Sequence, residues 1–215
     1  MGNLSINPID DITARTGQAA IVILLLTLAV TPVQIVTGYN PVAKIRKSLG
    51  LWAFAYALVH LWVFVGLDYG YSWRFIVQDG LVQKPYIIVG LLALLILLPL
   101  AITSTRGWMK RMGKQWKRLH QLIYAAGVLA VLHYIWVGKV FFGKPVYFAV
   151  LLAVLLAVRV PPVRRAVVQA RQRWWGKRQS VSTQKAPTDK VHAAKARAAK
   201  ARAKKSTVSV PEMPR

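Results

Sequence analysis

Histidines are the residues of this sequence whose type and position best fit chemistry inside apolar segments. The chain has four of them, and His60, His120 and His133 lie in or beside long hydrophobic runs. An ionisable or metal-binding side chain inside a membrane is costly and usually faces the interior of a helical bundle for a functional reason. A neutral histidine that only hydrogen-bonds to another helix is the alternative, and it stays open for each of the three.

His60 and His133 lie at similar distances from basic residues. Thirteen residues separate Lys47 from His60, and fifteen separate Arg118 from His133. At about 1.5 Å per helical residue, the imidazoles lie ~20 and ~23 Å from the same boundary, and because both segments run in the same direction, the rings can meet. Two facing imidazoles are the axial ligands of a low-spin b-type heme, which carries one electron. Zinc fits less well, because no third ligand of a suitable type lies at that depth.

His120 lies at the basic boundary itself. It precedes His133 by thirteen residues, so the two side chains point about 140° apart on an ideal helix. Arg46 precedes His60 by fourteen residues and lies within about 40° of its face. Three roles stay open for Arg46: a partner for a heme propionate, part of a second cofactor site with His120, or a positively charged anchor at the membrane surface.

The hydrophobic residues, 55% of the chain, are gathered into long runs, and the mean hydropathy is +0.40. About 20 apolar residues are needed to cross ~30 Å of hydrocarbon as a helix. Inside lipid each segment must satisfy its own backbone hydrogen bonds, so each run is predicted to be helical. The sequence therefore predicts an all-α integral membrane protein with a bundle of five transmembrane helices, at residues 19–36, 49–67, 86–102, 119–138 and 141–160.

The net charge of +24 is distributed unevenly between the loops. Basic residues are concentrated at 44–47, at 106–118 and after residue 164. The N-terminal segment and the loops on the other side of the predicted helices contain few of them, namely Arg15, Arg74, Lys84, Lys139 and Lys144. Since cytoplasmic loops of membrane proteins carry the excess of Lys and Arg, the N-terminus is predicted to lie outside and the C-terminus in the cytoplasm.

Three parts of the chain differ in composition. Residues 1–18 are predicted to form an extracytoplasmic segment, 19–160 the transmembrane bundle, and 161–215 a basic, largely disordered cytoplasmic tail. The tail is expected to be attracted to anionic lipid, and no nucleic acid is expected as a partner because no folded nucleic-acid-binding module accompanies it. The absence of cysteine excludes disulfides, iron–sulfur clusters and covalently attached c-type heme.

Several motifs resemble one family of membrane proteins. They are LGLWAFAYALVH at 49–60, KPYIIVG at 84–90, LAITST at 100–105 and GKQWKRLHQLIYAAGVLAVLHYIWVGK at 113–139. Together they resemble the MsrQ (YedZ) family, the heme-binding membrane subunits of periplasmic methionine sulfoxide reductase systems, which have a ferric-reductase-like transmembrane domain. The resemblance covers about residues 11–160. By position, His60 and His133 match the heme-ligand histidines of the family, and His120 matches its third recurrent histidine.

The resemblance implies an electron path through the bacterial inner membrane. Electrons would enter from a cytoplasmic flavin reductase or from quinol, and leave to the periplasmic molybdopterin subunit MsrP, which reduces methionine sulfoxide in periplasmic proteins. It implies heme b, with one heme or two left open, and suggests FMN, although no flavin site is visible in the residues. Members usually have one more helix before the first segment found here, so Met1 is expected to be a misassigned start or that helix to be absent.

Two other functions compete with this interpretation. A ferric- or oxygen-reductase-type carrier would use a different partner, and a self-contained reductase would need a flavin and nicotinamide domain. Only about 55 residues follow Val160 and they contain no G-x-G-x-x-G, too few for such a domain. A non-heme membrane anchor would be colourless when purified. Because no residue constellation for bond-making chemistry is found, the sequence predicts an electron-transfer subunit rather than an enzyme by itself.

Overall fold

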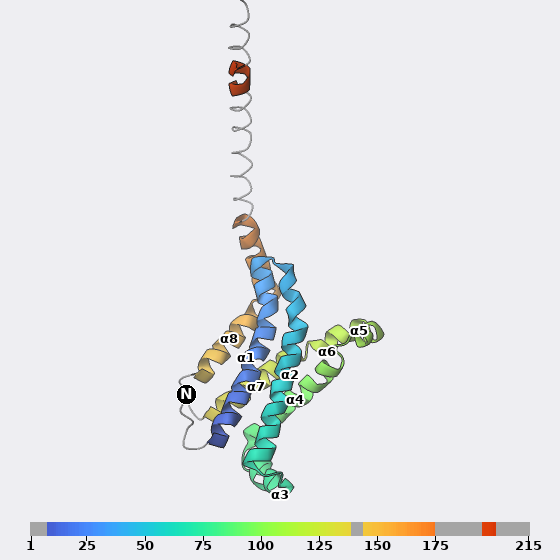
Figure 1. The fold of residues 1–215 in the computed structure, drawn as a ribbon, viewed down its shortest axis with the longest axis vertical. Helices are drawn as coiled ribbons and strands as arrows, with labels where there is room; N and C mark the ends of the chain where they lie inside the picture. Colours follow the sequence, from blue (N-terminus) through green and yellow to red (C-terminus); the bar gives the residue numbers. More distant parts are fainter. Residues whose placement is uncertain (1–7, 139–143, 175–194, 201–215) are drawn as a thin grey trace, which may run out of the picture. The chain divides into compact units, whose positions relative to one another are not determined.

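The computed structural model describes residues 8–138, 144–174 and 195–200, which are helical apart from short turns and contain no β-strand. Lys139, the start of the fifth predicted segment and most of the basic tail lie outside the described residues. The chain divides into two compact units, Met1–Arg164 and Arg165–Arg215. The described part of the second unit is helical, at 165–174 and 195–200. The first unit contains the helical bundle, and Figure 1 shows its elements.

Two long helices begin the bundle. Helix α1 spans Pro8–Thr37, and α2 spans Arg46–Val63 after a short 3₁₀ helix, Asn40–Ile45. Proline at the first helical position and acidic residues in the first turn, Asp10 and Asp11, favour a helix start at this point. Residues 8–18, predicted to precede the first span, are therefore helical and continuous with it. The two helices lie side by side in Figure 1.

A second pair of helices is formed by α4, Pro85–Ile102, and α7, Ile123–Gly138. Between α2 and α4 the chain forms π-helical segments at Phe64–Asp68 and Ile76–Val82 around the short helix α3, Trp73–Phe75. Between α4 and α7 lie two further short helices, α5 (Arg106–Met112) and α6 (Lys114–His120). The predicted fourth segment, 119–138, is thus interrupted by a turn at 121–122.

The last helix of the bundle, α8, spans Lys144–Ala157 and has 14 residues. At 1.5 Å per residue it is ~21 Å long, shorter than the ~30 Å hydrocarbon layer. Four helices of the described chain are long and apolar enough to cross a membrane, or up to five if the bent pair Pro145–Ala157 and Pro161–Trp174 is one span. The chain is therefore an all-α, multi-pass membrane protein, as its sequence predicts. Which side each terminus faces stays a prediction.

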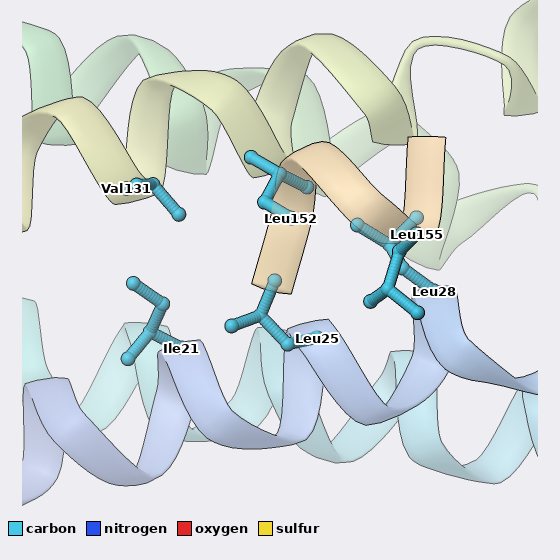
Figure 2. Close-up of a cluster of buried hydrophobic side chains, with 6 residues drawn as sticks. All are labelled: Ile21, Leu25, Leu28, Val131, Leu152 and Leu155. Carbon is cyan, nitrogen blue, oxygen red and sulfur yellow. The ribbon is translucent and has the colours of Figure 1, made fainter. Parts of the chain in front are cut away.

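Two clusters of buried side chains hold the bundle together. Figure 2 shows the first, in which α1 packs against α7 and α8 through Ile21, Leu25, Leu28, Val131, Leu152 and Leu155. The second contains Leu24, Ala53, Leu97 and Ala126, one residue each from α1, α2, α4 and α7. Ala53 is 1% exposed and Ala126 is 0% exposed. Small residues let membrane helices approach closely, so this second cluster fixes how α2 and α7, which carry His60 and His133, pack in the bundle.

A proline in α1 explains a long-range contact of α8. Pro32 has no N–H, so the carbonyl of Leu28, four residues earlier, lacks its usual helical donor. Arg159, just after α8, donates from Nη2 to this carbonyl at 2.6 Å. Its guanidinium also lies over the ring of Tyr124 in α7, 4.6 Å from the ring centre. Arg159 therefore joins the end of α8 to α1 and α7.

Candidate functional site

The structure places the imidazoles of His60 and His133 next to each other. His60 comes from α2 and His133 from α7. Their ring centroids are 6.3 Å apart, and the ring planes meet at 74°. Both side chains are only partly exposed. Two histidines that are far apart in the sequence thus share one place in the bundle.

Hydrogen bonds orient both rings through the same nitrogen. Nδ1 of His60 lies 3.0 Å from the carbonyl oxygen of Thr13 and 3.4 Å from the hydroxyl of Thr16, both on α1. Nδ1 of His133 lies 2.7 Å from the carbonyl oxygen of Tyr86 on α4. Because a carbonyl oxygen only accepts, Nδ1 of each ring carries the proton and donates it. In the neutral ring this tautomer leaves a lone pair on Nε2.

This arrangement fits two axial ligands of a heme. Histidines that bind metal almost always donate the other ring N–H to a carbonyl, a carboxylate or water. An iron bonded at about 2 Å to one nitrogen of each ring would hold the two ring centres about 6 Å apart, close to the distance found. No group of three or more His, Cys, Asp or Glu side chains among the described residues could hold a metal ion. The residues therefore suit a cofactor that needs two protein ligands better than a protein-only zinc site.

His120 lies at the end of α6 in a different environment. Its ring stacks on that of Trp116 at 3.9 Å, and its Nδ1 lies 3.1 Å from the Trp116 carbonyl oxygen. Trp116 is itself held to α4, because its Nε1–H donates to the Thr103 carbonyl at 2.9 Å. Nε2 of His120 is buried and makes no hydrogen bond of good geometry within the described chain, although the backbone of Leu100 on α4 lies close enough to interact with the ring. A lone pair on a buried Nε2 is what a metal ligand requires.

Arg46 is turned toward α1. Its Nη2 donates to Oε1 of Gln34 at 3.1 Å. No interaction that joins Arg46 to His120 is found among the described residues, so the pairing of these two residues in a second site stays a prediction.

A polar cluster fixes the start of α4, the helix that carries Tyr86. Lys84, the residue before α4, donates from Nζ to Asp79 at 2.8 Å and to the hydroxyl of Tyr69 at 3.0 Å. Tyr69 also donates to Asp79 at 2.8 Å. The hydrogen bonds from Lys84 and then from Tyr69 lower the pKa of the Asp79 carboxyl. The hydrogen bonds that Lys84 donates, first to Asp79 and then to Tyr69, raise the pKa of Lys84.

The backbone acceptors of the two histidines could not be identified from the sequence. A carbonyl oxygen belongs to every residue type, so Thr13 and Tyr86 carry no compositional signal. The spacing does carry one, because each histidine follows its acceptor by 47 residues. This signal becomes readable only after one of the two contacts is known.

Known proteins match most of the bundle. A family described as ferric reductase like transmembrane component matches residues 16–131, a range that includes His60 and His120 and ends two residues before His133. A protein of Xanthomonas axonopodis pv. citri (strain 306), named protein-methionine-sulfoxide reductase heme-binding subunit MsrQ, is 48% identical over 157 residues, which are 73% of this chain and 72% of the relative. A protein of the same name from Rhodospirillum rubrum is 45% identical over 166 residues, 76% of this chain and 79% of the relative.

Proposed function

Because the chain belongs to the MsrQ family of ferric reductase like transmembrane components, we propose that it carries electrons across the bacterial inner membrane through heme b held by His60 and His133. The observation that carries this proposal is the pair of rings, 6.3 Å apart, each with Nδ1 bonded to a carbonyl of a neighbouring helix. The relatives' printed name, which describes a heme-binding subunit of a methionine sulfoxide reductase, supports it.

Each residue of the pair has a defined part in this function. Nε2 of His60 and of His133 would hold the iron, and a heme held by two histidines would supply single-electron transfer. The carbonyls of Thr13 and Tyr86 hold the Nδ1 protons, which fixes the tautomer and raises the basicity of each ligand.

The proposed partners are those that the resemblance to the family implies. Electrons enter from a cytoplasmic flavin reductase or from quinol, and leave to a periplasmic molybdopterin subunit, MsrP, that repairs methionine sulfoxide in periplasmic proteins. The subunit is thus one part of an oxidoreductase system. His120, with its buried Nε2, is the residue on which a second heme would depend, while FMN and quinone are further candidate cofactors. A ferric or oxygen reductase with another partner is the competing function.

Absorption spectroscopy of the detergent-purified protein tests the heme site. The oxidised and dithionite-reduced wild type should show b-type bands at one or two hemes per chain. His60→Ala and His133→Ala should each lose the central heme while far-UV circular dichroism stays unchanged. A full heme complement in both variants would overturn the assignment of the ligands. A colourless wild type from heme-replete cells would support a non-heme anchor.

The variant His120→Ala decides the number of hemes. A fall from two hemes to one would place the second heme at His120, whereas an unchanged ratio of one would leave His120 with a structural or donor-side part. The partner is tested separately by mixing the reduced protein with purified MsrP and methionine sulfoxide. Heme reoxidation that requires MsrP supports the repair function, and reoxidation by ferric citrate alone supports the competing one.

A further inference from the structure

We propose that Gly17 and Gly90 are positioning residues for the two histidines, each leaving bare the backbone carbonyl that orients one imidazole. The inference deepens the function above, since it rests on the proposal that these imidazoles hold heme. Neither glycine has a side chain that could donate a hydrogen bond or carry a charge. Their role is to leave room at one point on the surface of α1 and of α4.

On α1 the space beside Gly17 is taken by His60. A Cβ added to Gly17 would lie 2.9 Å from Cε1 and 3.1 Å from Nδ1 of the His60 ring. The carbonyl that receives the His60 Nδ1 proton belongs to Thr13, one helical turn before Gly17. The ring thus lies against the helix at Gly17, with Nδ1 within hydrogen-bond distance of the Thr13 oxygen.

The same arrangement occurs on α4. A Cβ added to Gly90 would lie 2.8 Å from Nδ1 and 2.9 Å from Cε1 of His133. The acceptor is the carbonyl of Tyr86, again one turn earlier. Cβ atoms essentially never approach other atoms this closely. Here the atom in the way belongs to a short, ring-shaped side chain that is held by its own hydrogen bond.

Helix geometry explains why the glycine must stand four residues after the acceptor. Side chains in a helix lean toward the N-terminus, so a residue covers the surface above the turn that precedes its own Cα. A side chain at position 17 would therefore cover the Thr13 carbonyl, and one at position 90 would cover that of Tyr86. A carbonyl oxygen has two lone pairs, so it can accept both from its own helix and from a histidine that reaches it.

The two arrangements are copies of one pattern. Acceptor, glycine and histidine recur with a constant shift of 73 residues: Thr13 with Tyr86, Gly17 with Gly90, and His60 with His133. The buried cluster between the four helices follows the same shift, since it pairs Leu24 with Leu97 and Ala53 with Ala126. The pairs α1–α2 and α4–α7 are thus equivalent, and each presents one imidazole to the other.

We call each glycine, together with the carbonyl that it leaves accessible, the seat of its histidine. Replacing the glycine of either seat should weaken heme binding. In Gly17→Ala or Gly90→Ala the ring must move off the helix, so the bond from Nδ1 to the carbonyl breaks and the ligand becomes less basic. Loss of such outer contacts typically weakens metal binding 10–100-fold. A less basic ligand stabilises the ferric iron less, so the midpoint potential should rise. Gly50→Ala is the matched control, because a Cβ there meets only Thr27 Cγ2 at 3.7 Å, an ordinary contact.

The first measurement is heme retention against apomyoglobin, together with the low-spin electron paramagnetic resonance signal and a redox titration. Gly17→Ala and Gly90→Ala should release heme 10–100-fold more readily, with a shifted signal and a raised potential, while Gly50→Ala should match the wild type. Unchanged retention, signal and potential in both seat variants would overturn the inference.

A second measurement needs no heme. The unfolding of the apoprotein is compared for Gly17→Ala alone and for Gly17→Ala combined with His60→Ala. If Gly17 makes room for the imidazole, the alanine should destabilise the protein only while His60 is present. Equal destabilisation in both backgrounds would show that the glycine serves helix packing, and would overturn the inference even if the wild type binds heme. A colourless wild type would instead contradict the proposed function, and the seat would still be tested.

Discussion

The hydrogen bond from Arg159 to the Leu28 carbonyl should stabilise the protein only because Pro32 leaves that carbonyl without a helical donor, and this dependence is measurable. We consider Arg159→Met, Pro32→Ala and the double variant. In the wild type the carbonyl of Leu28 receives the Arg159 guanidinium at 2.6 Å. In Pro32→Ala the new backbone N–H of residue 32 can bond to the same carbonyl, as in an uninterrupted helix. The cost of Arg159→Met should therefore be smaller in the Pro32→Ala background.

The magnitude follows from competing contributions. Hydrogen bonds to charged groups contribute about 1.5–3 kcal/mol in proteins, whereas those between membrane helices average about 0.6 and reach about 1.7 kcal/mol. A short, charge-assisted bond belongs near the upper end of the membrane range, so we expect a coupling energy of about 1–1.5 kcal/mol. The contact of the guanidinium with Tyr124, about 0.5–2 kcal/mol, and the cost of burying the charge occur in both backgrounds and cancel in the cycle.

The assay is SDS-driven unfolding in mixed micelles, followed by far-UV circular dichroism at neutral pH. Pro99→Ala is the control background, because Pro99 also lies inside a helix, α4, while the bond of Arg159 runs to α1. The changes in the free energy of unfolding caused by Arg159→Met and by Pro99→Ala should be additive. Contacts that do not interact add within about 0.3–0.5 kcal/mol. A coupling with Pro32 inside that error would refute the reasoning that the proline creates the acceptor.

Two further predictions concern the polar cluster and the core. Asp79→Asn should destabilise the protein at neutral pH, and the difference in stability from the wild type should shrink as the pH falls below the usual aspartate pKa of 3.8. The reason is that a carboxyl whose pKa is lowered by folding stabilises the fold above that value and stops doing so as it protonates. Thermal unfolding in detergent measures the difference, and a difference that persists down to full protonation would contradict the prediction. Ala126→Leu should lower the free energy of unfolding by about 1–3 kcal/mol, because it overpacks a fully buried site. Ala125→Leu, on the exposed side of α7, should change it by less than about 0.5 kcal/mol. Equal stability of the two variants would argue against the packing described.

The family and the all-α membrane architecture could be predicted from residues alone, and both are confirmed. Helix boundaries could not: α1 begins at Pro8, a turn at 121–122 separates α6 from α7, and α8 has only 14 residues. Hydropathy locates the part of a helix that lies in lipid. Where the helix begins and ends depends on prolines, glycines and turns, which the apolar runs do not report.

The sequence by itself determined that this chain crosses a membrane as helices, because each long apolar run can satisfy its own backbone hydrogen bonds in lipid only as a helix. It also determined that His60 and His133 can lie at one depth, because the rise per helical residue is constant. Only the tertiary structure decided which faces meet. The membrane-spanning parts of helices such as α1 and α4 have no distinct polar face, so no pattern shows how they are rotated. The seats at Gly17 and Gly90 therefore emerge only when the helices are packed.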